Sequence, residues 1–301
     1  MPEAATAGRE SFGSRLGRAM ADRGPLCVGI DPHPALLQRW GLNDDAAGLE
    51  RFSLAVLEAV GPLAAAVKPQ VALYERHGSA GMAVLERTLA EAADASVLTI
   101  ADAKRGDIGS TMAAYADAWL RDGSALAADS VTLSPYLGFE SLRPALELAA
   151  QTGRGVFVLA LTSNPEGASV QHVGGADSVA RRIVQAAAME NQRYIGSPEP
   201  ENQQPAAGPG SAGLGSVGLV VGATVGSALT ELGLDLAAVR GPILAPGLGA
   251  QGATAADLRR TFGAAYGQVL GTSSRDILGA GPRVQDLYDA ARRTLEELRT
   301  A

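Results

Sequence analysis

Short, almost continuous apolar runs alternate along the chain with longer segments in which apolar residues recur every three or four positions. Nearly continuous apolar character is typical of parallel strands that are covered on both faces. The runs that indicate strands span residues 26–31, 64–68, 97–103, 129–133, 155–161, 218–223, 242–246 and 267–271. The segments with helical period span 44–61, 78–94, 109–122, 139–151, 176–192, 226–239, 253–263 and 283–299, and an extra amphipathic helix is expected at 9–23.

Eight strand–helix pairs in strict alternation predict an α/β fold of the (β/α)8 TIM-barrel type, here with an extra N-terminal helix. A doubly wound sheet is the alternative, but no G-x-G-x-x-G follows the first strand. We therefore expect one barrel domain over residues 1–301. The stretch 196–216 is rich in Gly, Pro, Ser and Gln without apolar period, which predicts a flexible insertion on the N-terminal face of the barrel.

Composition excludes several classes of protein. A chain that is 47% hydrophobic and 19% charged is too apolar to be disordered, and a net charge of −7 argues against nucleic acid as the main partner. One cysteine, Cys27, rules out a disulfide framework, and the three histidines have no metal-ligand spacing. No apolar run approaches the roughly 18 residues of a membrane span, and the first residues lack a signal-peptide core. We expect a cytoplasmic protein with no membrane partner.

Lysine is almost missing from this chain. Of its 25 basic residues 23 are arginine, and the two lysines are Lys68 and Lys104. Codon bias explains a general preference for arginine. An ammonium, however, can give up a proton where a guanidinium cannot, so a site that delivers a proton has a reason to keep lysine.

Both lysines fall where the predicted strands end, which is the face at which barrel active sites gather. Asp102 and Lys104, two apart on one strand, point to the same side, and Lys68 approaches from the neighbouring strand. With Asp107 these side chains can form one array of alternating charges. A structural ion-pair network is the other interpretation, but buried ion pairs are poor stabilisers, so the array favours a function. Asp31 ends the first strand on the same face.

Two Gly-rich segments follow the seventh and eighth strands, which is the recurrent phosphate site of this fold. The first contains Gly247, Gly249 and Gln251, and the second contains Ser274 and Arg275. Glycines let backbone N–H groups approach a phosphate, and an arginine can hold it with two hydrogen bonds.

The loop after strand five, about 162–176, opens with Thr162-Ser163-Asn164-Pro165. Its hydroxyl and amide groups suit a heterocycle, and its length suits a lid. An ordinary turn into a helix is the equally weighted alternative.

The segment Asp102-Ala-Lys104-Arg-Gly-Asp107-Ile-Gly resembles the D-x-K-R-x-D-I-G signature of the orotidine 5'-phosphate decarboxylase family. The resemblance extends over nearly the whole barrel, and T-S-N-P after strand five is similar to the bacterial branch with longer chains. It implies conversion of orotidine 5'-monophosphate to uridine 5'-monophosphate and CO2, the last step of de novo pyrimidine nucleotide synthesis. It also implies that no metal or organic cofactor is needed.

The resemblance implies a role for each matched residue. Lys104 would protonate C6 after CO2 leaves, with Asp102 against the substrate carboxylate and Lys68 holding the array. Asp107 and Thr111 would reach into the active site of a partner subunit, so a homodimer with shared sites is expected. The substrate contacts would come from Asp31 to the ribose, Ser163 to the pyrimidine, and Gln251 and Arg275 to the phosphate, with Gly247, Gly249 and Ser274 in the phosphate loop.

Two other functions remain open on the residues. A sugar-phosphate decarboxylase or synthase of the same superfamily resembles this chain in D-x-K-x-x-D but uses Mg²⁺ to stabilise an enediolate. The R-x-D-I-G continuation and the T-S-N-P loop favour the nucleotide. The other possible function is that of a non-catalytic phosphate-binding barrel, but a binding module needs no proton donor.

Overall fold

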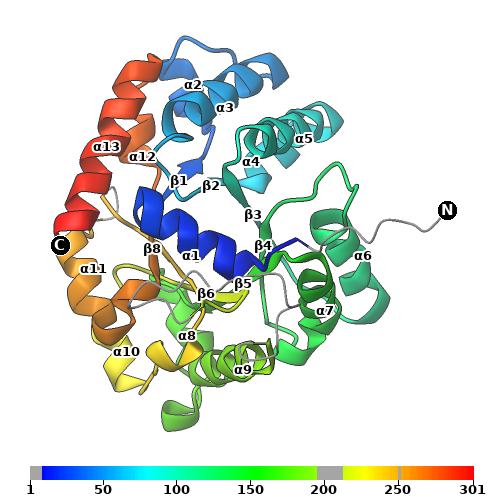
Figure 1. Cartoon of the computed structure of the whole chain (residues 1–301), viewed down its shortest axis with the longest axis vertical. Helices are drawn as coiled ribbons and strands as arrows, with labels where there is room; N and C mark the ends of the chain where they lie inside the picture. Colours follow the sequence, from blue (N-terminus) through cyan, green and yellow to red (C-terminus); the bar gives the residue numbers. More distant parts are fainter. Residues whose placement is uncertain (1–8, 195–212, 250–251) are drawn as a thin grey trace.

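The computed structural model describes residues 9–194, 213–249 and 252–301. Eight parallel strands close into one barrel in chain order, with the last strand hydrogen-bonded to the first (Figure 1). The strands are β1 (Leu26–Ile30), β2 (Ala66–Pro69), β3 (Leu98–Arg105), β4 (Ser130–Leu133), β5 (Gly155–Leu161), β6 (Val217–Val221), β7 (Ile243–Pro246) and β8 (Val269–Ser273). The predicted (β/α)8 barrel is confirmed, and each strand end lies within two residues of its expected place.

Helices form the outer layer of the barrel and cover its strands (Figure 1). They are α1 (Phe12–Arg23), α2 (Pro34–Arg39), α3 (Ala46–Val60), α4 (Val71–Glu75), α5 (Gly78–Asp94), α6 (Gly109–Leu120), α7 (Arg143–Thr152), α8 (Ala168–Gln171), α9 (Val179–Tyr194), α10 (Ala228–Glu231), α11 (Ala255–Phe262), α12 (Arg275–Leu278) and α13 (Val284–Thr300). Single 3₁₀ turns lie at Phe139–Leu142, Pro165–Gly167, Gly175–Asp177, Ala237–Val239 and Gly263–Gln268.

Four segments differ from the expectation. The helix expected at 226–239 is broken, because Gly233 adopts a left-handed φ of 60° two residues after α10 ends. The segment 162–176 is not an irregular loop, since it contains α8, the whole 3₁₀ turn Pro165–Gly167 and the start of the turn Gly175–Asp177. The short helices α2 and α4 were not predicted, because five or six residues are too few to show a helical period.

The extra N-terminal helix closes one end of the barrel. Figure 1 shows α1 lying across the strands, and its Phe12 and Leu16 are fully buried in a cluster with interior barrel residues. The Phe12 and Phe157 rings pack edge to face with centroids 5.9 Å apart. Gly155 has to be glycine, because a Cβ there would lie 2.1 Å from the Phe12 ring. With this end sealed, the opposite end is left for a ligand.

Cys27 lies in β1 and faces the same interior cluster, as expected of a small buried hydrophobic residue. Burial raises the pKa of its thiol to about 12. Trp40 and Trp119 are also buried, and the Trp40 indole donates a hydrogen bond of 3.1 Å to the Leu278 carbonyl. Both tryptophans are packing residues.

The expected insertion at 196–216 lies mostly outside the described residues. Its flanks join a helix to a strand, because α9 ends at Tyr194 and β6 begins at Val217. The buried Asn191 side chain donates to the carbonyls of Val217 and Val239 and accepts from the Val217 N–H, which fixes the start of β6. Among the described helices, none has the length and apolarity needed to cross a bilayer.

Candidate active site

Four charged side chains from three neighbouring strands meet at the open end of the barrel. Asp31 directly follows β1, Lys68 lies in β2, and Asp102 and Lys104 lie near the end of β3. The Lys68 ammonium is 2.9 Å from Asp102 Oδ2, and the Lys104 ammonium is 2.6 Å from Asp102 Oδ1. Lys68 is also 3.9 Å from Asp31 Oδ1. Asp102 is therefore the centre of the cluster, with one ammonium at each oxygen.

The charges in this cluster stabilise one another against burial. Burial would lower the pKa of Lys68, but the carboxylates of Asp102 and Asp31 outweigh it and hold the pKa above its ordinary value. Burial would likewise raise the pKa of Asp102, but Lys68 and Lys104 outweigh it and hold the pKa well below its ordinary value. Both side chains are therefore ionised at neutral pH.

The two lysines differ in access to solvent. The Lys68 side chain is 6% exposed, whereas that of Lys104 is 46% exposed. Lys104 also has a backbone φ of 49°, which is unusual for a residue with a side chain. A bound molecule can therefore reach the Lys104 ammonium, whereas the Lys68 ammonium is buried and contacts the cluster's own carboxylates.

Two further residues contact the cluster and were missed by sequence reasoning. The Thr132 hydroxyl, from β4, donates to Asp102 Oδ1 at 2.9 Å and accepts the Lys104 N–H at 2.9 Å. The side-chain amide oxygen of Gln70, Oε1, accepts a hydrogen bond of 3.5 Å from the Lys104 ammonium. Thr132 sits inside a run that reads as a buried strand, so no pattern separates it from packing residues.

Asp107 stands apart from the cluster within one chain. Across the described residues, none makes an ion pair with it within 4 Å, and its Oδ1 instead accepts the N–H of Ile108 at 2.8 Å. Thr111 is exposed in the first turn of α6. Of the four residues expected in the array, Lys68, Asp102 and Lys104 are in contact. The fourth position near Lys68 is taken by Asp31 and not by Asp107.

The expected phosphate loop follows β7, and Gln251 falls outside the described residues. Gly247 and Gly249 have φ of 116° and 77°, which favour glycine. A Cβ on Gly249 would lie 1.7 Å from a carboxylate oxygen of Asp276, so no side chain fits there. Ser274 and Arg275 lie at the start of α12, and the Arg275 side chain is exposed and open to a ligand.

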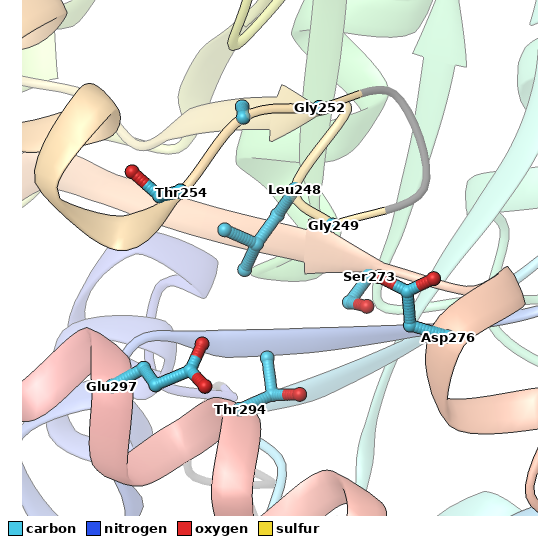
Figure 2. Close-up of a pocket in the computed structure, with 9 residues that line it drawn as sticks. Leu248, Gly249, Gly252, Thr254, Ser273, Asp276, Thr294 and Glu297 are labelled. Carbon is cyan, nitrogen blue, oxygen red and sulfur yellow. The ribbon is translucent and has the colours of Figure 1, made fainter.

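A cavity of about 170 Å³ lies next to this loop. Figure 2 shows Asp276 beside Gly249 and, across the cavity, Thr294 and Glu297 from α13. Two carboxylates line this space, so it does not suit an anion.

Ser163 follows β5 and is exposed. The side chain of Gln171 in α8 binds both the backbone and the side chain of the preceding Thr162. Its amide oxygen accepts from the Thr162 N–H at 2.9 Å, and its amide nitrogen donates to the Thr162 hydroxyl at 2.8 Å. The Thr162 hydroxyl in turn donates to Asn164 at 2.7 Å. These bonds fix the exit of β5, from which Ser163 projects.

A metal centre has no candidate ligand set in the parts of the chain that the structure describes. Over 9–194, 213–249 and 252–301, no three His, Cys, Asp or Glu side chains gather closely enough to hold an ion.

Comparison with known proteins gives consistent matches. The family model "Orotidine 5'-phosphate decarboxylase / HUMPS family" matches residues 24–290. The orotidine 5'-phosphate decarboxylase of Salinispora tropica is 55% identical over 292 residues, covering 97% of this chain and 98% of that protein. That of Streptomyces coelicolor is 53% identical over 295 residues, with the same two coverages.

Solved structures agree with these sequence matches. A Streptomyces avermitilis structure assigned to orotidine 5'-phosphate decarboxylase has a TM-score of 0.88 and 53% identity, covering 100% of this chain and 99% of that one. Leishmania donovani OMP decarboxylase has a TM-score of 0.70 and 29% identity, covering 96% and 98%.

Proposed function

We propose that this chain, which belongs to the orotidine 5'-phosphate decarboxylase / HUMPS family, converts orotidine 5'-monophosphate to uridine 5'-monophosphate and CO2. The observation that carries the proposal is the Lys68–Asp102–Lys104 cluster at the open end of the barrel. Relatives that carry the name of this decarboxylase are 52–55% identical over almost the full chain, which supports the same reaction.

The reaction breaks the bond between C6 and the carboxylate, and the electron pair stays on C6. Fixed positive charge where negative charge develops is usually the largest single contribution to stabilising such a transition state. The half-exposed Lys104 ammonium supplies that charge and then donates a proton to C6, which leaves a neutral amine that water reprotonates. A guanidinium gives up no proton at neutral pH, which explains lysine here in a chain that otherwise uses arginine.

Asp102 would lie against the substrate carboxylate. Its low pKa keeps it ionised, so the two negative charges repel each other in the bound substrate, and this repulsion ends when CO2 leaves. Lys68 holds Asp102 in place from below through its 2.9 Å contact.

The remaining contacts would hold the nucleotide. Asp31 Oδ1 is buried and has no hydrogen-bond partner among the residues that the structure describes, which suits a ribose hydroxyl as donor. Ser163 would contact the pyrimidine. The phosphate would be held by Gln251, Arg275 and Ser274, together with the backbone at Gly247 and Gly249.

The partner in this proposal is a second copy of the chain. Asp107 and Thr111 would enter the neighbouring subunit's site, and they flank Ile108, which is 62% exposed. Tyr136 and Leu137 are also exposed, and their loop lies beside this one because the Ser134 N–H donates to the Arg105 carbonyl at 2.7 Å. Such an apolar surface is typical of a contact between proteins.

A sugar-phosphate decarboxylase or synthase that depends on Mg²⁺ is the second candidate, since such enzymes resemble this chain in D-x-K-x-x-D. Both oxygens of Asp102 already contact ammonium groups, and a divalent cation placed beside two ammonium groups is repelled. We therefore favour the reaction without a cofactor. Activity that survives EDTA supports this choice, and activity that EDTA abolishes and Mg²⁺ restores supports the alternative.

We further propose that the chain is one catalytic domain over residues 1–301 and acts in the cytoplasm on a small nucleotide. The decisive experiment offers orotidine 5'-monophosphate to the purified protein and follows uridine 5'-monophosphate and CO2. Equal amounts of the two products are expected, with none from a Lys104→Ala control. Failure of the wild-type protein to form either product, with the fold verified by circular dichroism, overturns the proposal.

A further inference from the structure

Thr132 occupies a central place in the charge cluster although it carries no charge. It lies in β4, and the residue is 1% exposed. Its hydroxyl is bonded both to the backbone of Lys104 and to the carboxylate of Asp102, each at 2.9 Å. Thr132 is thus the side chain from β4 that joins the two residues assigned to the chemical step.

The direction of these two bonds is fixed by chemistry. A backbone N–H can only donate, and an ionised carboxylate can only accept. The hydroxyl therefore accepts from Lys104 and points its own proton at Asp102. Because the Lys104 ammonium contacts the same Asp102 oxygen, the backbone of Lys104, the hydroxyl, the carboxylate and the ammonium form a closed ring of contacts.

The hydroxyl also replaces a missing bond between strands. Ala101 pairs with Val131 and Arg105 pairs with Leu133, so residues 102–104 of β3 lie opposite one residue of β4, Thr132. The register shift makes β3 bulge at its end, where Lys104 takes its left-handed φ of 49°. At this irregular point the Lys104 N–H is bonded to the Thr132 side chain instead of a strand carbonyl.

We propose that Thr132 is a positioning residue for the decarboxylation, and that its hydroxyl sets the angle at which Asp102 and the Lys104 ammonium face C6 of the substrate. This inference rests on the proposed function. The ribose and phosphate contacts assigned above do not include Thr132, so its loss acts on the chemical step and leaves nucleotide binding almost unchanged. Misplacing a reacting group by as little as 1 Å costs on the order of 100-fold in rate.

The test compares Thr132→Val, which removes the hydroxyl and keeps the branched shape, with Thr132→Ser, which keeps the hydroxyl. Thr99→Val is the matched control. Thr99 is also buried in the barrel, and its hydroxyl also bonds a carboxylate, that of Asp129 at 3.2 Å. Thr99 lies near the beginning of β3, away from the charge cluster. Measurements are kcat, KM, the dissociation constant of uridine 5'-monophosphate and the melting temperature.

We expect Thr132→Val to lower kcat by at least about 10-fold, with KM and product affinity within about threefold of wild type. Thr132→Ser should recover kcat to within about fivefold of wild type. Thr99→Val should lower the melting temperature while kcat stays unchanged. If Thr132→Val does not fold, Thr132→Ala takes its place against Thr132→Ser.

Three results overturn the inference while the proposed function stands: a Thr132→Val enzyme with normal kcat, a loss confined to KM, or a Thr132→Ser enzyme as slow as Thr132→Val. Decarboxylation by the wild-type protein is measured in the same series. A wild-type protein without turnover overturns the proposed function and this inference together.

Discussion

The ammonium of Lys104 lies 2.6 Å from the carboxylate of Asp102, two residues earlier on the same strand. The contact joins two side chains of β3, so the positive charge is held at a fixed place at the open end of the barrel. Preorganised charge needs no rearrangement at the moment of reaction, which makes it effective in catalysis. The site is therefore prepared by the strand itself.

Replacing Lys104 tests its role as proton donor. Lys104→Ala should lower kcat by at least about 1,000-fold, because it removes both electrostatic stabilisation and proton transfer, each worth about 100-fold or more. Lys104→Arg keeps the positive charge but gives up no proton, so it should lower kcat by at least about 100-fold. Binding of uridine 5'-monophosphate should stay measurable by calorimetry in both variants. Turnover close to wild type in Lys104→Arg would contradict the role of proton donor.

Replacing Asp102 tests the electrostatic balance of the cluster. Asp102→Asn leaves Lys68 buried with its nearest remaining carboxylate, Asp31, at 3.9 Å, and should reduce the free energy of unfolding by about 3–5 kcal/mol. Asp117→Asn is the matched control, since Asp117 forms an exposed pair with Arg121 and should cost less than about 1 kcal/mol. Urea denaturation measures both values. Equal losses of unfolding free energy in the two variants would show that the cluster contributes no more to stability than an exposed ion pair does.

The stability difference between wild type and Asp102→Asn should depend on pH. The reason is the pKa of Asp102, which is lowered in the folded protein. Its ionised form therefore stabilises the fold above the ordinary carboxyl pKa of about 3.9, and this contribution is lost as the pH falls through the folded-state pKa. The stability gap between wild type and Asp102→Asn should stay constant from about pH 6 to 8 and shrink below about pH 4. A gap that grows on acidification would reverse the sign and refute the assignment.

Shared active sites predict complementation between two inactive proteins. Lys104→Ala lacks the proton donor, and Asp107→Ala lacks the residue proposed to cross to the partner. Mixed dimers contain one site that is intact in both respects, so random exchange should restore up to about a quarter of wild-type activity per site. Native mass spectrometry checks that subunits exchange. Proven exchange without recovered activity would mean that each chain completes its own site.

The sealed end of the barrel should affect stability and leave catalysis unchanged. Phe12→Ala empties a fully buried site against Phe157 and should cost about 3–5 kcal/mol of unfolding free energy. KM should not change, because α1 covers the end of the barrel opposite the charge cluster. Phe12→Leu, which fills more of the space, should cost less. Thermal unfolding and steady-state kinetics of Phe12→Ala and Phe12→Leu measure both effects. A raised KM in Phe12→Ala would show that packing at the sealed end of the barrel affects the site at the open end.

Most of the barrel was predictable because buried parallel strands leave a continuous apolar signal. The cluster of Lys68, Asp102 and Lys104 was predictable as well, since spacing along β3 and the order of neighbouring strands fix which side chains face one another. Rare residue types at strand ends added the second signal.

The parts that sequence reasoning missed depend on contacts that no local pattern encodes. Thr132 looks like any residue of a buried strand, and its role follows from the register shift between β3 and β4. The helix expected at 226–239 has a suitable apolar period, but Gly233 ends it by adopting a left-handed conformation. In both cases the backbone geometry, not the apolar pattern, decides the outcome.

The burial of Cys27 has a practical consequence for experiments on this enzyme. Its thiol is enclosed in the barrel, and its pKa of about 12 keeps it protonated at neutral pH, so alkylating reagents and oxidants should leave it untouched in the folded protein. A cysteine introduced on the surface would then be the sole reactive thiol. Fluorescent dyes or spin labels can therefore be attached at one chosen position without first removing the native residue.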